Sequence, residues 1–239
     1  MPHPMARRAR AALGALLGRV PMDRDDARAR MLRFNKTTVV VDCGANTGQY
    51  AARLRRTGYT GRIISFEPSS AAFSRLQQAS SRDPGWTCYN LALGAATGEV
   101  SLNVGEESTL SSVLMPTSDP EINFHFRVAS QELVSIDRLD RLLPAHLSDR
   151  DIVHLKLDVQ GLELEVLAGA SAILPCVATV ECELPLLSTY RDQPSLAQVL
   201  EVLNQEGFTP VRLDPNYVDP ESGYCVDIDA LFRRKPVDL

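Results

Sequence analysis

Short apolar runs alternate with segments of helical spacing along most of the chain. The first run, residues 36–42, is rich in β-branched residues and ends in Asp42, as is typical of a buried parallel strand. Apolar positions then recur at helical spacing up to Gly58, and a second apolar run at 62–67 ends in Glu67. The same patterns predict further strands at 86–91, 100–104, 151–158, 176–182, 208–213 and 224–228, and further helices at about 69–80, 161–168 and 195–206.

Strands that alternate with helices in this way indicate an α/β fold. We expect a Rossmann-like, doubly wound, mostly parallel sheet of seven strands, whose last strand at 224–228 is antiparallel because it follows a short turn. This domain would span residues 36–239, and residues 1–35 would form an N-terminal helical extension. Between 105 and 127 the periodicity fades, which predicts a lid or a substrate-binding loop.

The N-terminal residues loosely resemble a secretory signal, because three arginines precede the apolar residues 11–18. Arg19 ends this apolar stretch early, so we expect instead a short amphipathic helix that docks on the domain or lies on a membrane surface. No segment reaches the ~18 apolar residues of a membrane-spanning helix, and the protein is expected to be soluble.

Composition narrows the partners and the compartment. The chain has 30 acidic and 25 basic residues and a net charge of −5, so nucleic acid is not an expected partner. Its five cysteines are odd in number and widely spread, which disfavours a disulfide framework and predicts a cytoplasmic protein. The oligomeric state stays open.

Polar residues follow the central strands, where ligands of open α/β sheets bind. The glycine-containing segment 42–49 leads from the first strand into a helix, whose free N–H groups favour a nucleotide-type ligand. The candidate ligand-binding residues at the strand ends are Asp42, Gly44, Asn46, Gly48, Glu67, Asn90, Asp158, Glu181 and Glu183.

The glycine spacing excludes two common phosphate-binding motifs. The motif G-x-G-x-x-G would need glycines at Asn46 and Gln49, and G-x-x-x-x-G-K-[ST] is absent. Glu67 follows the loop by about 20 residues, the spacing at which an acid accepts hydrogen bonds from both ribose hydroxyls. A ribose without a pyrophosphate favours S-adenosylmethionine, and an ordinary βα turn is the alternative.

Four segments, in their order and spacing, resemble the FkbM-type S-adenosylmethionine-dependent methyltransferases. They are residues 39–50 (VVVDCGANTGQY), 65–68 (SFEP), 90–94 (NLALG) and 155–170 (LKLDVQGLELEVLAGA). The resemblance covers about residues 39–183 and implies a class I methyltransferase domain. Known members are commonly O-methyltransferases, and many act on sugar hydroxyls of polyketides, glycolipids or surface polysaccharides.

The resemblance also implies roles for individual residues. One group would hold the methionine end of the cofactor: Asp42, Gly44, Asn46 and Gly48. Glu67 would bind the ribose, Asn90 and its neighbours the adenine, and Asp158 would face the methyl group. The family block usually reads Asp-Val-Glu-Gly, whereas Gln160 replaces the glutamate here, so we assign Gln160 no catalytic function.

Methyl transfer to an alcohol requires an aligned attack and the removal of a weakly acidic proton. Asp158 is our first candidate for the base, or for a ligand of a divalent metal that acidifies the hydroxyl. Lys156 lies two residues earlier on the same strand face, where it would tune or pair with Asp158. A helix cap at Asp158 and a purely structural ion pair at Lys156 are the alternatives.

Three further acidic or basic side chains are candidates for substrate or metal binding. Glu181 and Glu183 flank Cys182 on one face of a predicted strand, which indicates substrate or metal binding, or simple exposure where the strand leaves the sheet. His125 lies in the loop at 105–127 and would enter the site when the loop closes.

The sequence therefore predicts an O-methyltransferase for a small-molecule or glycoside acceptor, with metal dependence open. A nicotinamide dehydrogenase is disfavoured because the chain has no Tyr-x-x-x-Lys pair. An amino-group methyltransferase is disfavoured because no acid-Pro-Pro-aromatic turn follows the fourth strand. A non-sugar acceptor, and a methyltransferase-like binding protein without catalysis, remain alternatives.

Overall fold

The computed structural model describes residues 23–118 and 127–235 of the chain. In this described part, seven strands form the main sheet, in the order β3-β2-β1-β7-β8-β10-β9. They are β1 (Val39–Cys43), β2 (Arg62–Phe66), β3 (Trp86–Tyr89), β7 (Val153–Leu157), β8 (Val177–Pro185), β9 (Phe208–Val218) and β10 (Cys225–Arg234).

The pairs β3-β2, β2-β1, β1-β7 and β7-β8 are parallel, and β10 runs antiparallel to both of its neighbours. The predicted seven-stranded, mostly parallel sheet with an antiparallel last strand is confirmed. The chain builds outward from β1 to β3 and then crosses back to β7, so the strand order reverses between β1 and β7.

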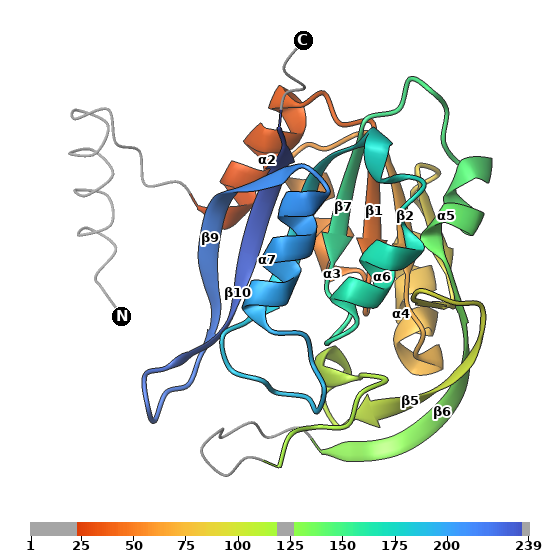
Figure 1. The fold of residues 1–239 in the computed structure, drawn as a ribbon. Helices are drawn as coiled ribbons and strands as arrows, with labels where there is room; N and C mark the ends of the chain where they lie inside the picture. Colours follow the sequence, from red (N-terminus) through yellow and green to blue (C-terminus); the bar gives the residue numbers. More distant parts are fainter. Residues whose placement is uncertain (1–22, 119–126, 236–239) are drawn as a thin grey trace, which may run out of the picture.

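Helices cover both faces of this sheet, as Figure 1 shows for α6 and α7 in front and α3 behind. The helices are α2 (Arg24–Phe34), α3 (Gln49–Arg56), α4 (Ser70–Ser80), α5 (Leu139–Leu142), α6 (Glu163–Gly169) and α7 (Leu196–Gln205), with short 3₁₀ turns η1 (Ser108–Leu110), η2 (Leu143–Ala145) and η3 (Leu174–Cys176). None of these helices has the length and apolar character needed to cross a bilayer.

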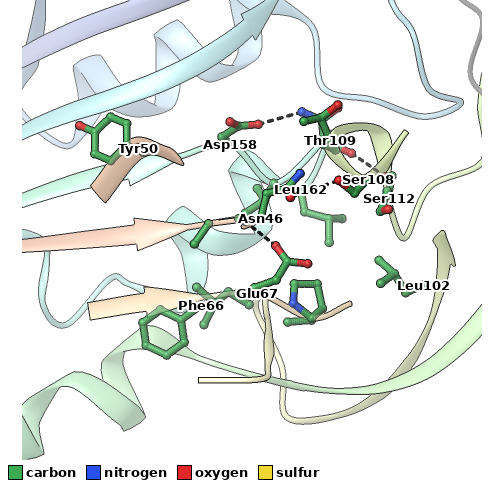
Figure 2. A pocket seen from close by; sticks show the side chains of 18 of the residues that line it. Asn46, Tyr50, Phe66, Glu67, Leu102, Ser108, Thr109, Ser112, Asp158 and Leu162 are labelled. Atoms are coloured by element: carbon green, nitrogen blue, oxygen red, sulfur yellow. Dashed lines mark hydrogen bonds between the residues drawn. The ribbon is translucent and has the colours of Figure 1, made fainter. Parts of the chain in front are cut away.

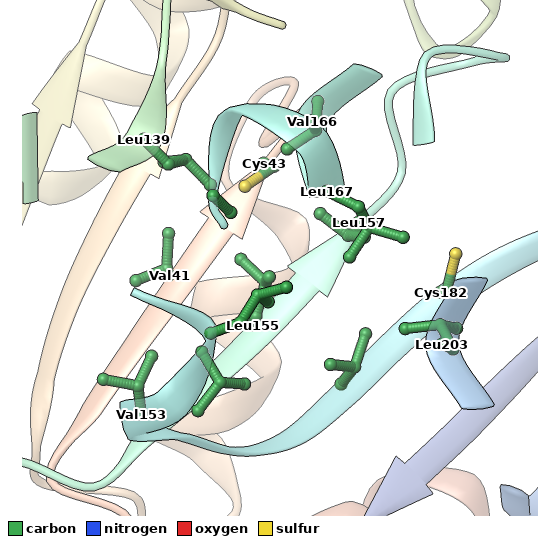
Figure 3. Packing of buried hydrophobic residues seen from close by; sticks show 14 of the residues in the cluster. Val41, Cys43, Leu139, Val153, Leu155, Leu157, Val166, Leu167, Cys182 and Leu203 are labelled. Carbon is green, nitrogen blue, oxygen red and sulfur yellow. The ribbon is translucent and has the colours of Figure 1, made fainter. Parts of the chain in front are cut away.

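Alternate side chains of strand β1 point to opposite faces of the sheet and pack into two different apolar clusters. Val39, Val41 and Cys43 face a large apolar cluster that includes residues of α5, α6 and α7 (Figure 3). Val40 faces the opposite side, where a second cluster contains Leu32 of α2 and residues of α3 and α4. All five residues of β1 are buried, so its apolar run reflects helices on both faces.

A second sheet lies beyond the carboxyl ends of β1 and β7 (Figure 1). It consists of β4 (Ala92–Leu93), β6 (Val128–Asp137) and β5 (Gly98–Gly105), in the order β4-β6-β5. The strand expected at 100–104 therefore exists as β5, but it pairs with β6 and not with the main sheet. The sequence did not predict β6, because Val134 is its only buried residue and the alternation is weak.

Helix α2 packs on the main sheet and carries a buried charge. Arg28 is 4% exposed, and its Nε donates to Glu181 Oε2 on β8 at 2.7 Å, while a second guanidinium nitrogen donates to Glu181 Oε1. Tyr50 of α3 donates to the same Glu181 Oε2 at 2.8 Å. Burial raises the pKa of Glu181, but the hydrogen bonds and charges of Arg28 and His154 together outweigh this effect and hold that pKa below its usual range. The amphipathic helix expected at residues 11–18 lies outside the described residues.

Replacing Arg28 by Met should lower the free energy of unfolding by about 3–5 kcal/mol, because Glu181 would keep a buried charge without its partner. Since the folded pKa of Glu181 is depressed, this stabilisation is present above pH 4.5, its unperturbed value, and is lost as the pH falls further. Urea unfolding at several pH values measures both effects. Arg30→Met, on the exposed face of α2, is the control and should change stability by less than about 0.5 kcal/mol.

Candidate active site

The loop after β1 passes unusually close to the segment after β7. Gly44 has φ +76°, and a Cβ at this position would lie 1.8 Å from the carbonyl oxygen of Asp158. Asn46 also has a positive φ, of 49°, and Gly48 begins α3 in the left-handed region. A side chain at Gly44 is excluded by both conformation and space, which explains the glycine that the sequence places there.

Glu67, directly after β2, is held by this loop. Its Oε2 accepts a hydrogen bond from the backbone N–H of Asn46 at 2.8 Å, and its Oε1 accepts one from the N–H of Ser69 at 2.9 Å. The residue is 6% exposed, and burial raises the pKa of Glu67 to about 7 although both hydrogen bonds oppose the rise. Each oxygen keeps a lone pair for a ligand hydroxyl.

A cavity of about 240 Å³ opens between this loop, the carboxyl ends of β2 and β7, and the segment after β5. We call it the glycine-loop cavity. Figure 2 shows Glu67 and Asn46 on one side of it and Ser108, Thr109 and Ser112 across from them. Phe66, Leu91, Ala92, Leu93 and Leu102 add an apolar wall, which suits a flat heterocycle.

Lys156 on β7 joins the parts of this site. Its Nζ lies 3.2 Å from Asp42 Oδ1 and 3.1 Å from Asp158 Oδ2, and it donates to the carbonyl oxygen of Gly44 at 3.0 Å. Burial lowers the pKa of Lys156, but the charges of Asp158 and Asp42 outweigh it and raise that pKa above its ordinary value. The pairing expected between Lys156 and Asp158 is present in the structure.

Gln160 fixes the other oxygen of Asp158. Its backbone has φ +53°, and its side-chain Nε2 donates to Asp158 Oδ1 and to Glu183 Oε2, each at 2.8 Å. Its Oε1 accepts the hydroxyl of Tyr190 at 2.7 Å. The sequence assigned Gln160 no function, yet the structure places it at the centre of the site; its position before Gly161 in the family block was the available signal.

A second cavity, of about 440 Å³, adjoins the first, and we call it the acidic cavity. Thr109, Asp158 and Gln160 line both cavities and form their shared wall. The remaining polar lining of the acidic cavity consists of Glu107, Glu163, Glu183, Thr189, Tyr190, Gln193, Asn216, Tyr217 and Asp227.

Three residues expected to contact the cofactor do not line the glycine-loop cavity. Asp42 is fully buried beneath it and accepts from Ser65 Oγ at 3.3 Å besides pairing with Lys156. Gly48 packs against the ring of Trp86. Asn90 is exposed, and its Nδ2 donates to the carbonyl oxygens of Glu67 and Pro68, so its neighbours, residues 91–93, form the wall instead.

Glu181 and Glu183 lie on the same face of β8 but at different depths. Glu181 lies opposite Lys156 in the pairing of β7 with β8, and its carboxylate accepts hydrogen bonds from Arg28. We therefore no longer consider it a candidate for substrate or metal binding. Glu183 lies two residues further along the strand and lines the acidic cavity. The two glutamates differ because Arg28 of α2 pairs with Glu181, whereas Glu183 lines the cavity. His125 lies outside the described residues.

The loop expected at 105–127 supplies the outer wall of the site within its described part. Ser108 Oγ donates to Asn46 Oδ1 at 3.2 Å, and Ser112 Oγ donates to the carbonyl oxygen of Gln160 at 2.6 Å. Among the residues that the structure describes, no group of three or more His, Cys, Asp or Glu side chains is arranged to hold a metal ion. The sequence could not single out these serines, because nothing in their spacing marks them.

Comparison with known families identifies a match over most of the chain. The family model described as the methyltransferase FkbM domain matches residues 42–210. This range begins at the end of β1 and extends into β9, so it includes most of the described residues of both cavities. No curated protein matches the chain.

The solved structures that this chain is similar to have low sequence identity with it. The magnesium protoporphyrin IX methyltransferase of Synechocystis, with bound S-adenosylmethionine, is 14% identical over 88% of this chain and 78% of that chain, with a TM-score of 0.49. Fibrillarin of Aeropyrum pernix, also with S-adenosylmethionine, is 11% identical over 86% and 73%, with a TM-score of 0.48. An rRNA methylase of Streptococcus thermophilus is 12% identical over 90% and 98%, with a TM-score of 0.46. None of the three indicates a substrate for this chain.

Gly44→Ala should destabilise the protein far more than alanine at another glycine of similar φ. Gly223 has φ +75° and open space where an added methyl group would lie, so Gly223→Ala should cost about 1–2 kcal/mol of backbone strain. Gly44→Ala should cost about 1–3 kcal/mol more, because its Cβ meets the backbone of Asp158. Chemical unfolding of both variants measures the difference, and equal losses would show that the loop moves freely.

Proposed function

Because the chain belongs to the methyltransferase FkbM domain family, we propose that it transfers the methyl group of S-adenosylmethionine to a hydroxyl of a small molecule or glycoside. The observation that carries this proposal is the shared wall of the two cavities, formed by Thr109, Asp158 and Gln160. A donor in the glycine-loop cavity and an acceptor in the acidic cavity would meet at Asp158.

The glycine-loop cavity suits S-adenosylmethionine. Glu67 offers two carboxylate oxygens that backbone N–H groups already orient, which is the arrangement needed to accept both ribose hydroxyls. The apolar residues 91–93 lie next to it, where an adenine would stack. The loop after β1 also lines the cavity, with Gly44 and Ala45.

When bound, S-adenosylmethionine supplies a methyl group already activated by its sulfonium and leaves as S-adenosylhomocysteine. The acceptor oxygen forms the new bond to carbon as the carbon–sulfur bond breaks, and its proton must leave. Asp158 is the group that takes this proton, since its carboxylate lies at the junction of the cavities and is 37% exposed. Lys156 and Gln160 position the two oxygens, and each oxygen retains a free lone pair.

Lys156 and Asp42 support this chemistry without contacting the acceptor. Asp42 has no exposed surface, and its charge and that of Asp158 hold Lys156 between β1 and β7. A divalent metal held by Asp158 is the alternative to direct proton transfer, and an assay with and without a chelator separates the two.

Glu67→Ala should weaken the binding of S-adenosylmethionine by roughly 10- to 150-fold, because hydrogen bonds to a charged acceptor contribute about 1.5–3 kcal/mol. Isothermal calorimetry of the purified protein measures this, with NAD as the control ligand. Glu99→Ala, at an exposed position of β5, is the control variant and should bind as the unaltered protein does. Binding of NAD, or of neither ligand, contradicts the proposal.

The pH dependence of the same titration tests the role of Glu67 separately. Ribose hydroxyls favour the ionised carboxylate, and the pKa of Glu67 is raised to about 7, so affinity should rise about tenfold from pH 6 to pH 8. Glu67→Gln should remove this slope. Titration of the ligand itself affects both proteins equally and cancels in their ratio.

Asp158→Asn should lower kcat by about 100- to 10,000-fold, the usual contribution of a general base. Its affinity for S-adenosylmethionine should change by less than about threefold, because the ribose and adenine contacts remain. A pool of glycosides and ¹³C-methyl-labelled donor supplies the assay, and the carbon chemical shift of the product distinguishes an ether from a methylamine. Asp149→Asn, at an exposed site, is the control. An unchanged kcat would remove Asp158 from the reaction.

A further inference from the structure

The acidic cavity collects negative charge without a matching cation. Five carboxyl groups line it: Glu107, Asp158, Glu163, Glu183 and Asp227. In the described part of the chain, its lining contains no Lys, Arg or His side chain. The cation that pairs with Asp158 is Lys156, which lies on the side of the glycine-loop cavity. Carboxyl groups this close to one another disfavour each other's ionised form unless a positive group lies between them.

Neutral groups hold the acids at the centre of this cavity. Glu183 Oε2 accepts from Gln160 Nε2 and its Oε1 accepts from Asn216 Nδ2, each at 2.8 Å. Asp227 Oδ1 accepts from the backbone N–H of Tyr217 at 3.2 Å. These hydrogen bonds fix the carboxyl groups in place, but their donors are neutral and supply no counter-charge, so the positions are set for a charged ligand.

Glu163 supplies an independent observation, because one of its oxygens has no partner. The residue is 2% exposed and lines the acidic cavity. Its Oε1 accepts from the N–H of Gly161 at 3.2 Å, whereas its Oε2 is buried and makes no hydrogen bond within the described part of the chain. An unsatisfied buried carboxyl oxygen is costly, and a ligand N–H donor in the cavity would satisfy it.

Titration of these acids agrees with this geometry. Burial raises the pKa of Glu163 to about 7, and burial together with neighbouring acids raises the pKa values of Glu183 and Asp227 above their usual range. A cation bound among them would reverse the contribution of the neighbouring charges.

We propose that the acidic cavity binds a protonated amine of the acceptor, so that the substrate is an amino sugar or a similar cyclic amino alcohol. This inference rests on the proposed function and names the acceptor class of the same site. Glu163, Glu183 and Asp227 hold the ammonium group, and a hydroxyl of the same ring reaches Asp158 at the shared wall. The amine stays protonated and is not the methylated group.

The shape of the cavity favours an organic ammonium ion over a metal ion. A metal ion needs several oxygens within about 2.0–2.6 Å of one point. The described residues contain no such cluster, and the carboxyl groups instead surround about 440 Å³. An ammonium group on a ring fills this space and offers up to three N–H donors to separated acceptors.

Two matched pairs of probes test the proposal by calorimetry, in the presence of S-adenosylhomocysteine and at about pH 6.5. The first pair is D-glucosamine and D-glucose, and the second is trans-2-aminocyclohexanol and trans-cyclohexane-1,2-diol. Within each pair the ring is the same and an ammonium group replaces one hydroxyl. We expect at least one amine to bind about tenfold or more tightly than its uncharged partner. Equal affinity within both pairs, or no binding of either amine at about 50 mM, overturns the inference.

Variants assign the preference to this cavity. Glu183→Gln should reduce the preference for the amine at least about fivefold, and Asp227→Asn is a second variant in case the first fails to fold. Glu165→Gln, on the exposed face of α6, is the control and should keep the full preference. A preference that survives both cavity variants places the amine elsewhere and overturns the inference. The titrations are repeated with magnesium chloride. If it abolishes amine binding, the site is one for a metal ion and the inference is wrong.

A separate titration of S-adenosylmethionine keeps the two proposals distinguishable. If the protein binds S-adenosylmethionine but does not prefer the amines, the methyltransferase proposal stands and the inference that the acceptor is an amino sugar or amino alcohol is wrong. If the protein prefers the amines but does not bind S-adenosylmethionine, the proposed methyl donor is wrong and the methyltransferase proposal fails. Transfer of the labelled methyl to the amine nitrogen contradicts both the hydroxyl acceptor and the role given to the ammonium group.

Discussion

A buried ammonium group constrains the rest of the site. Lys156 lies in register with Asp42 across β7 and β1, and it has three polar partners on two segments: Asp42 and Gly44 at the end of β1, and Asp158 after β7. An amine without those partners would be too costly to bury, so the loop after β1 and the segment after β7 must both approach it. That approach brings the loop into contact with the backbone of Asp158, leaving no room for a side chain at Gly44. The buried charge of Lys156 therefore determines how the two segments meet at the wall between the cavities.

The sequence was sufficient for the parts of the fold that depend on local pattern. Runs such as residues 36–42 and 151–158 are rich in apolar residues, so they predicted buried central strands with polar groups at their ends, and both strands are buried throughout. The distance along the chain from the glycine loop to Glu67 predicted an acid that binds a ribose, which stays a prediction. The structure adds a contact that the sequence did not indicate, the hydrogen bond from the backbone N–H of Asn46 to Glu67. Sequence information works here because each feature involves neighbouring strands and their immediate turns.

Features that depend on distant segments could not be predicted. Glu181 and Glu183 are two residues apart and equivalent by period, and only Arg28, far away in the sequence, distinguishes them. Residues 128–137 do not alternate regularly between apolar and polar positions, so they did not indicate β6, which pairs with β5. Asn90 resembles a ligand contact in sequence, whereas in the structure it holds the backbone of Glu67 and Pro68.

The bridge made by Gln160 has a consequence for the evolution of related chains. One amide nitrogen serves two carboxylates, so a glutamate at this position, as in the usual Asp-Val-Glu-Gly block, would face Asp158 and Glu183 with a third negative charge. Positions 160 and 183 should therefore co-vary: a chain with glutamate at the first needs a donor or a neutral residue at the second. Changing Gln160 alone to glutamate would bring three carboxylates together without the amide donor that now lies between two of them.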